Sequence, residues 1–196
     1  MVGSESIAID TSTNKQKQDW FLSLNPNGRI PIIVDNIQNP PFAVMETSAE
    51  LIYLLEFDKN NYFGLDNDLE RNEALQWLFF WHGGGAPYQG KLGFFCRAKE
   101  QSSFAIDHFR KETYRVFDVL KLRLSGKSTA ASRDYLVAEG RGKYSVSDIG
   151  AWAWVKDWSR SGFTMEEMAN FPHLLKWIDR IAERPAVKRG ISSKYT

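Results

Sequence analysis

The spacing of apolar positions divides the chain into a front part with strand-like alternation and a longer part with helical periodicity. In the front part, short alternating segments and turn residues interrupt one another every few residues. The predicted elements are, in order, a strand at Ser6–Asp10, a helix at Asp19–Leu24, strands at Pro31–Val34 and Phe42–Met45, and a helix that begins in Glu46-Thr47-Ser48 and ends near Phe57.

From Leu69 onward the apolar positions recur with helical spacing, and the strand pattern ends. The main predicted helices there are Arg71–Trp81, Ser103–Leu124 and Pro172–Glu183. The polar stretch Lys59–Asp68 precedes them, and Lys188–Thr196 is expected to be a loosely held tail. We therefore expect a domain at residues 1–58, a linker at 59–68 and an all-helical domain at 69–196.

A run of three glycines and a proline, HGGGAP, follows the helix that ends at Trp81. Each glycine costs a helix up to about 1 kcal/mol and proline about 3, so the run should kink or interrupt it. An interruption beside Trp81, His82 and Tyr88 fits the wall of a hydrophobic substrate pocket. A loop between two core helices, with a structural His82, fits the same residues.

Ser145 and Asp148 have the spacing of a capping box, in which the serine and the acidic residue satisfy each other's backbone N–H groups. Tyr144 and Ile149 flank them as the two apolar members of a hydrophobic staple. The role that we predict for this motif is structural.

Composition limits the classes of partner. The formal net charge is +1, which favours neither nucleic acid nor an anionic membrane. Cys96 is the only cysteine, so no internal disulfide and no Cys-x-x-Cys redox pair can form. The three histidines lack metal-ligand spacing, and Glu5 and Asp10 argue against a targeting peptide, so we expect a metal-free cytoplasmic protein.

Two features of the front part could hold a small anionic ligand. If the Ile30-Pro31 bond is cis, the backbone of Ile30 turns outward and can pair with an extended peptide. The free N–H groups and the positive end of the dipole at the helix start near Thr47 attract a carboxylate. The alternative is an ordinary capped helix after a hairpin, with Thr47 and Ser48 serving only as caps.

The motifs NPNGRIPIIVD and ETSAELIYLLE resemble the glutathione-binding half of the glutathione transferase superfamily. There an NP-x-G-x-[IV]-P turn precedes a cis-proline, and an E-[ST]-x-A-I helix start follows. The stretches WLFFWHGGGAPYQG, FPHL and RPAV in the second half are also similar to family landmarks, and the whole is most similar to the fungal class related to the yeast nitrogen-regulatory prion protein. The resemblance implies an α+β thioredoxin-like domain followed by an all-α domain.

The resemblance also implies how glutathione would be bound. Ile30 and Pro31 would pair with its cysteinyl backbone, and Glu46 and Thr47 would hold its γ-glutamyl end. The further ligand contacts that it implies are Gln16, Arg29 and Arg115.

The sequence departs from the family pattern at its front end. A thioredoxin-like fold begins with one more strand and helix, which carry the residue that activates the thiol of glutathione. Only five residues precede Ser6, so no catalytic residue can be transferred, and the catalytic group stays unknown. Arg29 and helix-end dipoles would then have to lower the thiol pKa.

These observations predict an enzyme that uses glutathione on a hydrophobic, electron-poor substrate, and a homodimer as in the family. The thiolate would add to an activated carbon and give either a conjugate or, after bond rotation and loss of glutathione, trans/cis isomerisation. The resemblance extends to fungal secondary-metabolite enzymes, including a double-bond isomerase of a pseurotin-type pathway. The alternative is a non-catalytic module that binds glutathione.

Overall fold

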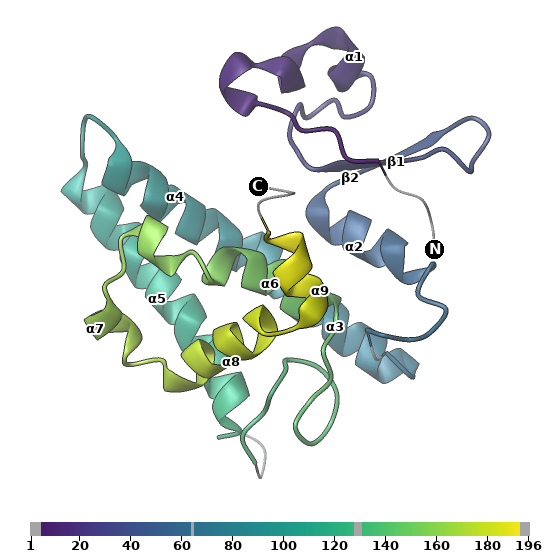
Figure 1. The fold of residues 1–196 in the computed structure, drawn as a ribbon. Coiled ribbons are helices and arrows are strands. Elements are labelled where there is room, and N and C mark those ends of the chain that lie inside the picture. Colours follow the sequence, from purple (N-terminus) through teal and green to yellow (C-terminus); the bar gives the residue numbers. More distant parts are fainter. Residues whose placement is uncertain (1–4, 64, 128–130, 193–196) are drawn as a thin grey trace. The chain divides into compact units, whose positions relative to one another are not determined.

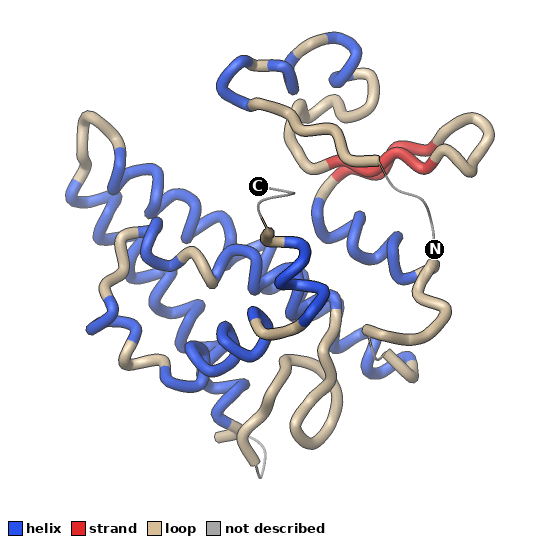
Figure 2. The backbone as a smooth tube through the Cα atoms, in the orientation of Figure 1, coloured by secondary structure: helices blue, strands red, loops and turns tan. Residues whose placement is uncertain are grey.

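The computed structural model describes residues 5–63, 65–127 and 131–192. It separates into two compact units, Met1–Phe57 and Asp58–Thr196, which are described in turn. Figure 1 gives the order of the elements along the chain. Figure 2 shows that, among the described residues, the strands lie in the first unit and helices dominate the second.

The first unit is built on a two-stranded antiparallel sheet. Strand β1 (Ile32–Asp35) pairs with β2 (Phe42–Met45), with Ile32 opposite Met45 and Asp35 opposite Phe42. Helix α2 (Thr47–Leu55) follows β2 directly and packs on both strands. Two 3-10 turns, Thr11–Thr13 and Lys15–Lys17, and the short helix α1 (Asp19–Leu22) precede the sheet. The strands at 31–34 and 42–45 and both predicted helices are confirmed.

The predicted strand at Ser6–Asp10 is wrong, because the described residues of that segment have no regular structure. Ile7, one of its two apolar positions, is 75% exposed. Alternation of apolar and polar residues suits a strand, but a strand also needs a neighbour that pairs with its backbone N–H and C=O groups. In the described part of the unit, β1 and β2 pair with each other and with no third strand.

The second unit is helical. Its helices are α3 (Asp68–Phe80), α4 (Ala86–Arg97), α5 (Ser103–Ser125), α6 (Val146–Val155), α7 (Met165–Met168), α8 (Pro172–Ala182) and α9 (Pro185–Gly190). Helices α4 and α5 lie side by side, and α8 packs against both α5 and α6 (Figure 1). That residues 59–68 form a linker between two domains stays a prediction.

The glycine run does not interrupt the helix. Trp81–Gly85 forms a π-helical turn that joins α3 to α4, so the predicted interruption and the alternative of a loop are both wrong, while the predicted kink stays a prediction. A π turn leaves room in the hydrogen-bond ladder, which accommodates Pro87 in the first turn of α4. Gly85 is required for packing, since a Cβ there would lie 2.6 Å from Cζ3 of Trp81.

The core of the second unit consists of aromatic and leucine side chains. Phe117 on α5 contacts both Phe163 and Phe171, with ring centroids 5.2 and 5.8 Å apart. The largest side chains that are fully buried in this unit are Trp81, Trp177, Phe117 and Phe171. These buried rings build the core of the unit, whereas other aromatic side chains, such as Phe79, Phe94 and Phe104, are exposed.

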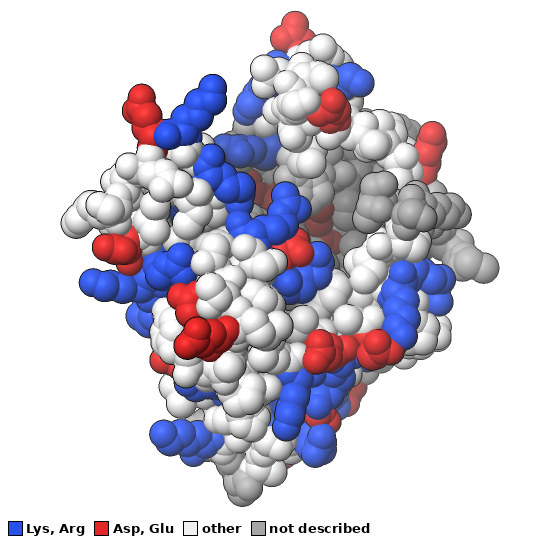
Figure 3. All heavy atoms as spheres, turned by 60° about the vertical axis from the view of Figure 1, so that its left-hand side comes forward, with Lys and Arg blue, Asp and Glu red and all other residues white. Residues whose placement is uncertain are grey.

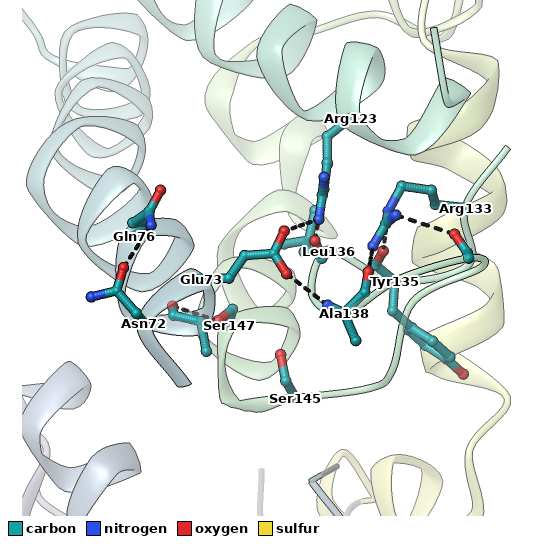
Figure 4. A network of polar contacts seen from close by, with 12 residues as sticks. Asn72, Glu73, Gln76, Arg123, Arg133, Tyr135, Leu136, Ala138, Ser145 and Ser147 are labelled. Carbon is teal, nitrogen blue, oxygen red and sulfur yellow. Dashed lines mark hydrogen bonds and ion pairs between the residues drawn. The ribbon is translucent and has the colours of Figure 1, made fainter. Parts of the chain in front are cut away.

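A polar network fixes the loop between α5 and α6 (Figure 4). Glu73 on α3 forms an ion pair with Arg123 on α5, and its other oxygen accepts the N–H of Ala138 at 2.8 Å. Arg123 also donates to the carbonyl of Leu136 at 2.8 Å. The guanidinium of Arg133, which is only 6% exposed, donates to carbonyls of the same loop, including Gly140 at 3.1 Å. These bonds replace the regular structure that the loop lacks.

The predicted capping box is confirmed at the start of α6. One oxygen of the buried Asp148 accepts the N–H and the hydroxyl of Ser145 at 3.0 and 3.1 Å. The other oxygen accepts the N–H of Leu136 at 3.2 Å and the indole N–H of Trp177 at 2.8 Å. Burial raises the pKa of Asp148 to about 6, although all four bonds oppose this shift. One carboxylate thus joins α6, the preceding loop and α8.

The end of the chain is more regular than predicted. Helix α9 continues to Gly190, so residues 188–190 do not form a loose tail, and residues 193–196 lie outside the described part of the chain. None of the described helices combines the length and the apolar character needed to cross a bilayer. On the face shown in Figure 3, basic and acidic side chains are interspersed, in keeping with the small net charge.

We predict that Asp148→Ala lowers the free energy of unfolding by about 2–4 kcal/mol, because it leaves three buried N–H donors unpaired. Thermal melting followed by circular dichroism measures this. Asp179→Ala, which removes an exposed carboxylate from α8, is the control and should change stability by less than about 0.5 kcal/mol. Equal melting temperatures for the two variants would contradict the role given to Asp148.

Candidate functional site

The turn before β1 is organised by the side chain of Asn25, which is 1% exposed. Its Oδ1 accepts the N–H of Asn27 at 3.0 Å, and its Nδ2 donates to the carbonyl of Arg29 at 2.8 Å. Its backbone carbonyl accepts the N–H of Gly28 at 2.9 Å. An asparagine can make this set of bonds because its amide both donates and accepts. The sequence analysis used the NPNGRIP motif but did not assign Asn25 this role.

Glycine is needed at position 28 of this turn. Gly28 has φ +61°, and a Cβ there would lie 2.9 Å from the carbonyl oxygen of Gln16. After the turn, the Ile30-Pro31 bond is cis. Ile30 is 48% exposed, and no hydrogen bond of its backbone N–H or C=O is found within the described residues. The chain therefore presents an unpaired stretch of backbone just before β1.

The start of α2 lies next to this turn. Nδ2 of Asn27 donates to Oε1 of Glu46 at 3.2 Å, which joins the turn to the residue that precedes the helix. Glu46 has φ 74°, and its side chain does not cap the helix. The N–H of Thr47 at the first position of α2 has no partner within the helix and lies at the positive end of the helix dipole.

Gln16 and Arg29 flank the same turn. Gln16 is 9% exposed, its Nε2 donates to the carbonyl of Thr11 at 3.2 Å, and its Oε1 has no hydrogen-bond partner among the described residues. Arg29 is exposed and forms no ion pair with any described residue. Nζ of Lys17 donates to the carbonyl of Asn27 at 3.0 Å. The turn thus carries two positive charges that are not neutralised by an ion pair in the described part of the chain.

Glu50 is a buried acidic residue that the sequence analysis missed. It is 6% exposed, and its Oε1 has no hydrogen-bond partner among the described residues. Burial raises the pKa of Glu50 to about 7, and the negative charge of Glu46 adds to the shift. In the helix motif E-[ST]-x-A-I, isoleucine stands at this position. The presence of an acidic residue where the motif has an apolar one could have identified Glu50 as a buried carboxyl group from the sequence.

Asp35 attaches α2 to the sheet. Its Oδ2 accepts the hydroxyl of Tyr53 on α2 at 2.6 Å, and its Oδ1 accepts the N–H of Ile37 at 2.8 Å. The bond from Tyr53 is the main reason that the pKa of Asp35 is lowered. This bond attaches α2 to β1, and so helps to position Thr47 and Glu46 at the start of the helix.

The other predicted site residues lie in the helical unit. Arg115, on α5, forms an ion pair with Glu112 at 2.9 Å. Trp81 is fully buried and belongs to the core, His82 is half-buried in the π-helical turn, and Tyr88 on α4 has its ring centroid 6.4 Å from that of Phe109. None of Trp81, His82 and Tyr88 lines the cavity of about 300 Å³ that lies farther along α4.

The first unit therefore holds six of the seven predicted glutathione contacts, at or beside the turn and the helix start: Gln16, Arg29, Ile30, Pro31, Glu46 and Thr47. Arg115 belongs to the other unit. Among the described residues, no group of three or more His, Cys, Asp or Glu side chains could hold a metal ion.

No family model matches the chain. Individual relatives do. An uncharacterised GST-like protein of Streptococcus mutans is 35% identical over 89% of this chain, which spans only 65% of that relative's length. The disulfide-bond oxidoreductase YfcG of Escherichia coli is 33% identical over 94% of this chain and 81% of its own.

Solved structures show the same relationship. A glutathione transferase homologue of Lodderomyces elongisporus, crystallised with two GSH per subunit, has a TM-score of 0.82 and is 32% identical over 93% of this chain and 83% of its own. The glutathione transferase URE2P6 of Phanerochaete chrysosporium, in complex with oxidised glutathione, has a TM-score of 0.84 and is 31% identical over 94% of this chain and 81% of its own.

We predict that Glu50→Gln stabilises the protein above neutral pH. The pKa of Glu50 is raised in the folded state, so the unfolded chain loses this proton first as the pH rises. The stability of the wild type therefore falls between about pH 4.5 and pH 7 through this group. The variant should be more stable by up to about 3 kcal/mol at pH 8 and nearly unchanged at pH 4.

Denaturant unfolding of both proteins at pH 4, 6 and 8 measures the difference. Glu56→Gln is the matched control, because it replaces an exposed carboxylate directly after the same helix. Its free energy of unfolding should differ from that of the wild type by the same small amount at every pH. A gain for Glu50→Gln that does not change with pH would show that Glu50 is not held protonated in the folded protein.

Proposed function

The chain belongs to the glutathione transferase superfamily, and we propose that its first unit binds glutathione beside Ile30, with the γ-glutamyl end at Glu46 and Thr47. The observation that carries this proposal is the hydrogen bond from Asn27 to Glu46, which places the turn and the start of α2 next to each other. The chain shares 33% of its residues with YfcG over 94% of its length, and the two similar structures contain glutathione in reduced or oxidised form.

The backbone of Ile30 supplies the pairing that a tripeptide requires. Its N–H and C=O are unpaired within the described residues, and the residue is about half exposed. The cysteinyl residue of glutathione can donate and accept hydrogen bonds there as an added strand does. Pro31 follows without an N–H of its own, so the chain offers this pairing at one residue only.

The charges around the turn match the two ends of glutathione. Oε1 of Glu46 accepts from Asn27, and its Oε2, which accepts no hydrogen bond from the described residues, can accept from the γ-glutamyl ammonium. The backbone N–H and the hydroxyl of Thr47, at the start of α2, can donate to the γ-glutamyl carboxylate. Arg29 and Gln16 lie beside the turn, where the cation can pair with the glycyl carboxylate. Arg115 is proposed as a further contact because of its position in the family pattern.

The reaction that we favour is addition of the glutathione thiolate to an activated carbon of a hydrophobic substrate. The sulfur forms a bond to one carbon of a conjugated double bond, and the electron pair of that double bond moves onto the electron-withdrawing group. Protonation then gives a conjugate. Alternatively, rotation about the new single bond followed by expulsion of the thiolate gives the trans/cis isomer and returns glutathione. The second outcome would suit a secondary-metabolite isomerase such as one of the pseurotin type.

Disulfide reduction is a second candidate, because a relative that is 33% identical is named a disulfide-bond oxidoreductase. The sequence argument against redox chemistry rested on a protein cysteine, but glutathione itself can supply both thiols. One thiolate attacks the substrate disulfide and releases a thiol, and a second glutathione resolves the mixed disulfide to oxidised glutathione. This chemistry requires that the site hold two glutathione molecules in turn.

We predict that Glu46→Gln weakens glutathione binding about tenfold or more, because a charge-assisted hydrogen bond to the ammonium becomes a neutral one. Isothermal titration calorimetry with reduced glutathione measures the change. Glu56→Gln removes a carboxylate from the other end of the same helix and should bind as the wild type does. Unchanged affinity in Glu46→Gln, or no binding by the wild type, would refute the proposed site.

Three substrates distinguish the proposed reactions, each incubated with glutathione and the protein. A chloronitroarene tests conjugation by substitution, a conjugated trans-enone tests addition and isomerisation, and a small dialkyl disulfide tests reduction. We expect no conjugate with the chloronitroarene and glutathione-dependent turnover of the enone, measured by proton NMR. Glutathione binding without turnover of any of the three would favour the alternative of a non-catalytic binding module.

We also propose that the protein is a cytoplasmic homodimer with a hydrophobic substrate pocket at His82 and Tyr88, for which the predicted third member, Trp81, serves only as buried support. The dimer is proposed from the family resemblance, and Phe79, Phe94 and Phe104, which are 63%, 59% and 83% exposed, are candidates for its interface. Sedimentation equilibrium should give twice the mass of the chain. A sedimenting species with the mass of one chain at micromolar concentration would contradict the dimer.

A further inference from the structure

A cavity of about 300 Å³ lies within the helical unit, between the second half of α4, the end of α6 and the segment that follows α6. Its size is at the lower end of the range for small-molecule sites. All of its lining residues belong to one compact unit. The glutathione site proposed above lies in the other unit and does not include this cavity.

Two glycines on one face of α4 shape its wall. A Cβ on Gly90 would lie 3.4 Å from the ring of Trp154, and one on Gly93 would lie 3.0 Å from Nη1 of Arg97 and 3.4 Å from the carbonyl oxygen of Arg160. The absence of side chains at these positions lets the indole and the guanidinium lie along the helix. Gly93 itself is buried.

The position of the wall is fixed by two hydrogen bonds. Gln89, which is 2% exposed, donates its Nε2 to the carbonyl of Trp154 at 2.8 Å, so the end of α6 is attached to α4. Nη1 of Arg97 donates to the carbonyl of Arg160, which attaches the segment after α6 to the same helix. The cavity is therefore preformed and is bounded by elements that are joined to one another.

The charge of the lining is positive. Arg97 and Arg160 form no ion pair with any described residue, whereas the one carboxylate of the lining, Asp157, pairs with Lys156 at 2.9 Å. Arg97 uses one of its five N–H groups in the bond to Arg160, so the others remain available to a ligand. A guanidinium with free donors in a preformed cavity is suited to a carboxylate, which it can hold with two bonds.

The apolar part of the lining is flat. Trp154 is 41% exposed, and Ala153 beside it adds a methyl group. Gly90 lies against the ring of Trp154 and has no side chain that would cover it. The exposed part of the indole favours a planar, conjugated group, which stacks on it.

From this combination we infer that the cavity binds a small organic anion with a planar aromatic or conjugated body, its carboxylate on Arg97 and its ring on Trp154. The inference does not depend on glutathione binding or on the proposed reaction. Its test is carried out without glutathione, so its outcome is independent of the outcome for the site in the first unit.

The probe is 2-naphthoate, titrated into the full chain by calorimetry, with the uncharged 2-naphthalenemethanol as its analogue. We expect the acid to bind at least tenfold more tightly than the alcohol. Arg97→Met should weaken binding of the acid at least tenfold and leave the weak binding of the alcohol unchanged. Arg71→Met removes an exposed arginine from α3, outside the cavity, and should bind the acid as the wild type does.

Two further measurements separate a lost contact from a lost fold. Arg97→Lys keeps the charge but not the paired donors, so it should bind the acid with intermediate affinity. Sodium chloride should weaken binding of the acid and not of the alcohol. Equal affinity of the acid for the wild type and Arg97→Met, equal affinity of the wild type for the acid and the alcohol, or no binding of the acid to the wild type would overturn the inference.

Discussion

The buried amide of Asn25 is the interaction on which the proposed glutathione site depends. It holds both ends of the turn, through the N–H of Asn27 and the carbonyl of Arg29, and its own backbone carbonyl holds Gly28. The geometry of the turn decides where Asn27 can reach Glu46, and so where the turn meets the first N–H groups of α2. An uncharged residue that binds no ligand thus determines the positions of those that would.

The first unit uses charge in two opposite ways. Asp35 is stabilised as an anion by three donors, among them Tyr53, and this attaches α2 to the sheet. Glu50, one turn closer to the helix start, is buried beside Glu46 without a partner for Oε1 in the described structure. A protonated Glu50 is compatible with a carboxylate ligand at the helix start, because it adds no negative charge there, whereas an ionised Glu50 would oppose it. The burial of Glu50 therefore lowers the stability of the unit above neutral pH, close to the place where we propose that a ligand binds.

The second unit depends on polar bonds in a different place. Its helices bury a large aromatic core, yet the connection between α5 and α6 is irregular and is fixed by Asp148, Glu73 and Arg133. Each of these charged side chains forms hydrogen bonds with the backbone of the loop. These bonds pair loop N–H and C=O groups that have no partner in a helix or a sheet. The cavity beside α4 is lined by two glycines of that helix and by Trp154, whose ring lies against Gly90.

Local rules determined much of this protein from the sequence. The two strands, the helix starts at Thr47 and Ser103, and the Ser145–Asp148 capping box follow from patterns within a few residues, and the family resemblance follows from two motifs. Features that depend on residues distant in the sequence were decided only by the tertiary structure. Alternation at Ser6–Asp10 gave no strand because no neighbouring strand pairs with it, and the glycines after Trp81 formed a π-helical turn because the surrounding helices support it. The buried state of Glu50 and the cavity at Arg97 and Trp154 arise from packing between elements, since burial and enclosure are properties of the assembled fold and not of any single segment.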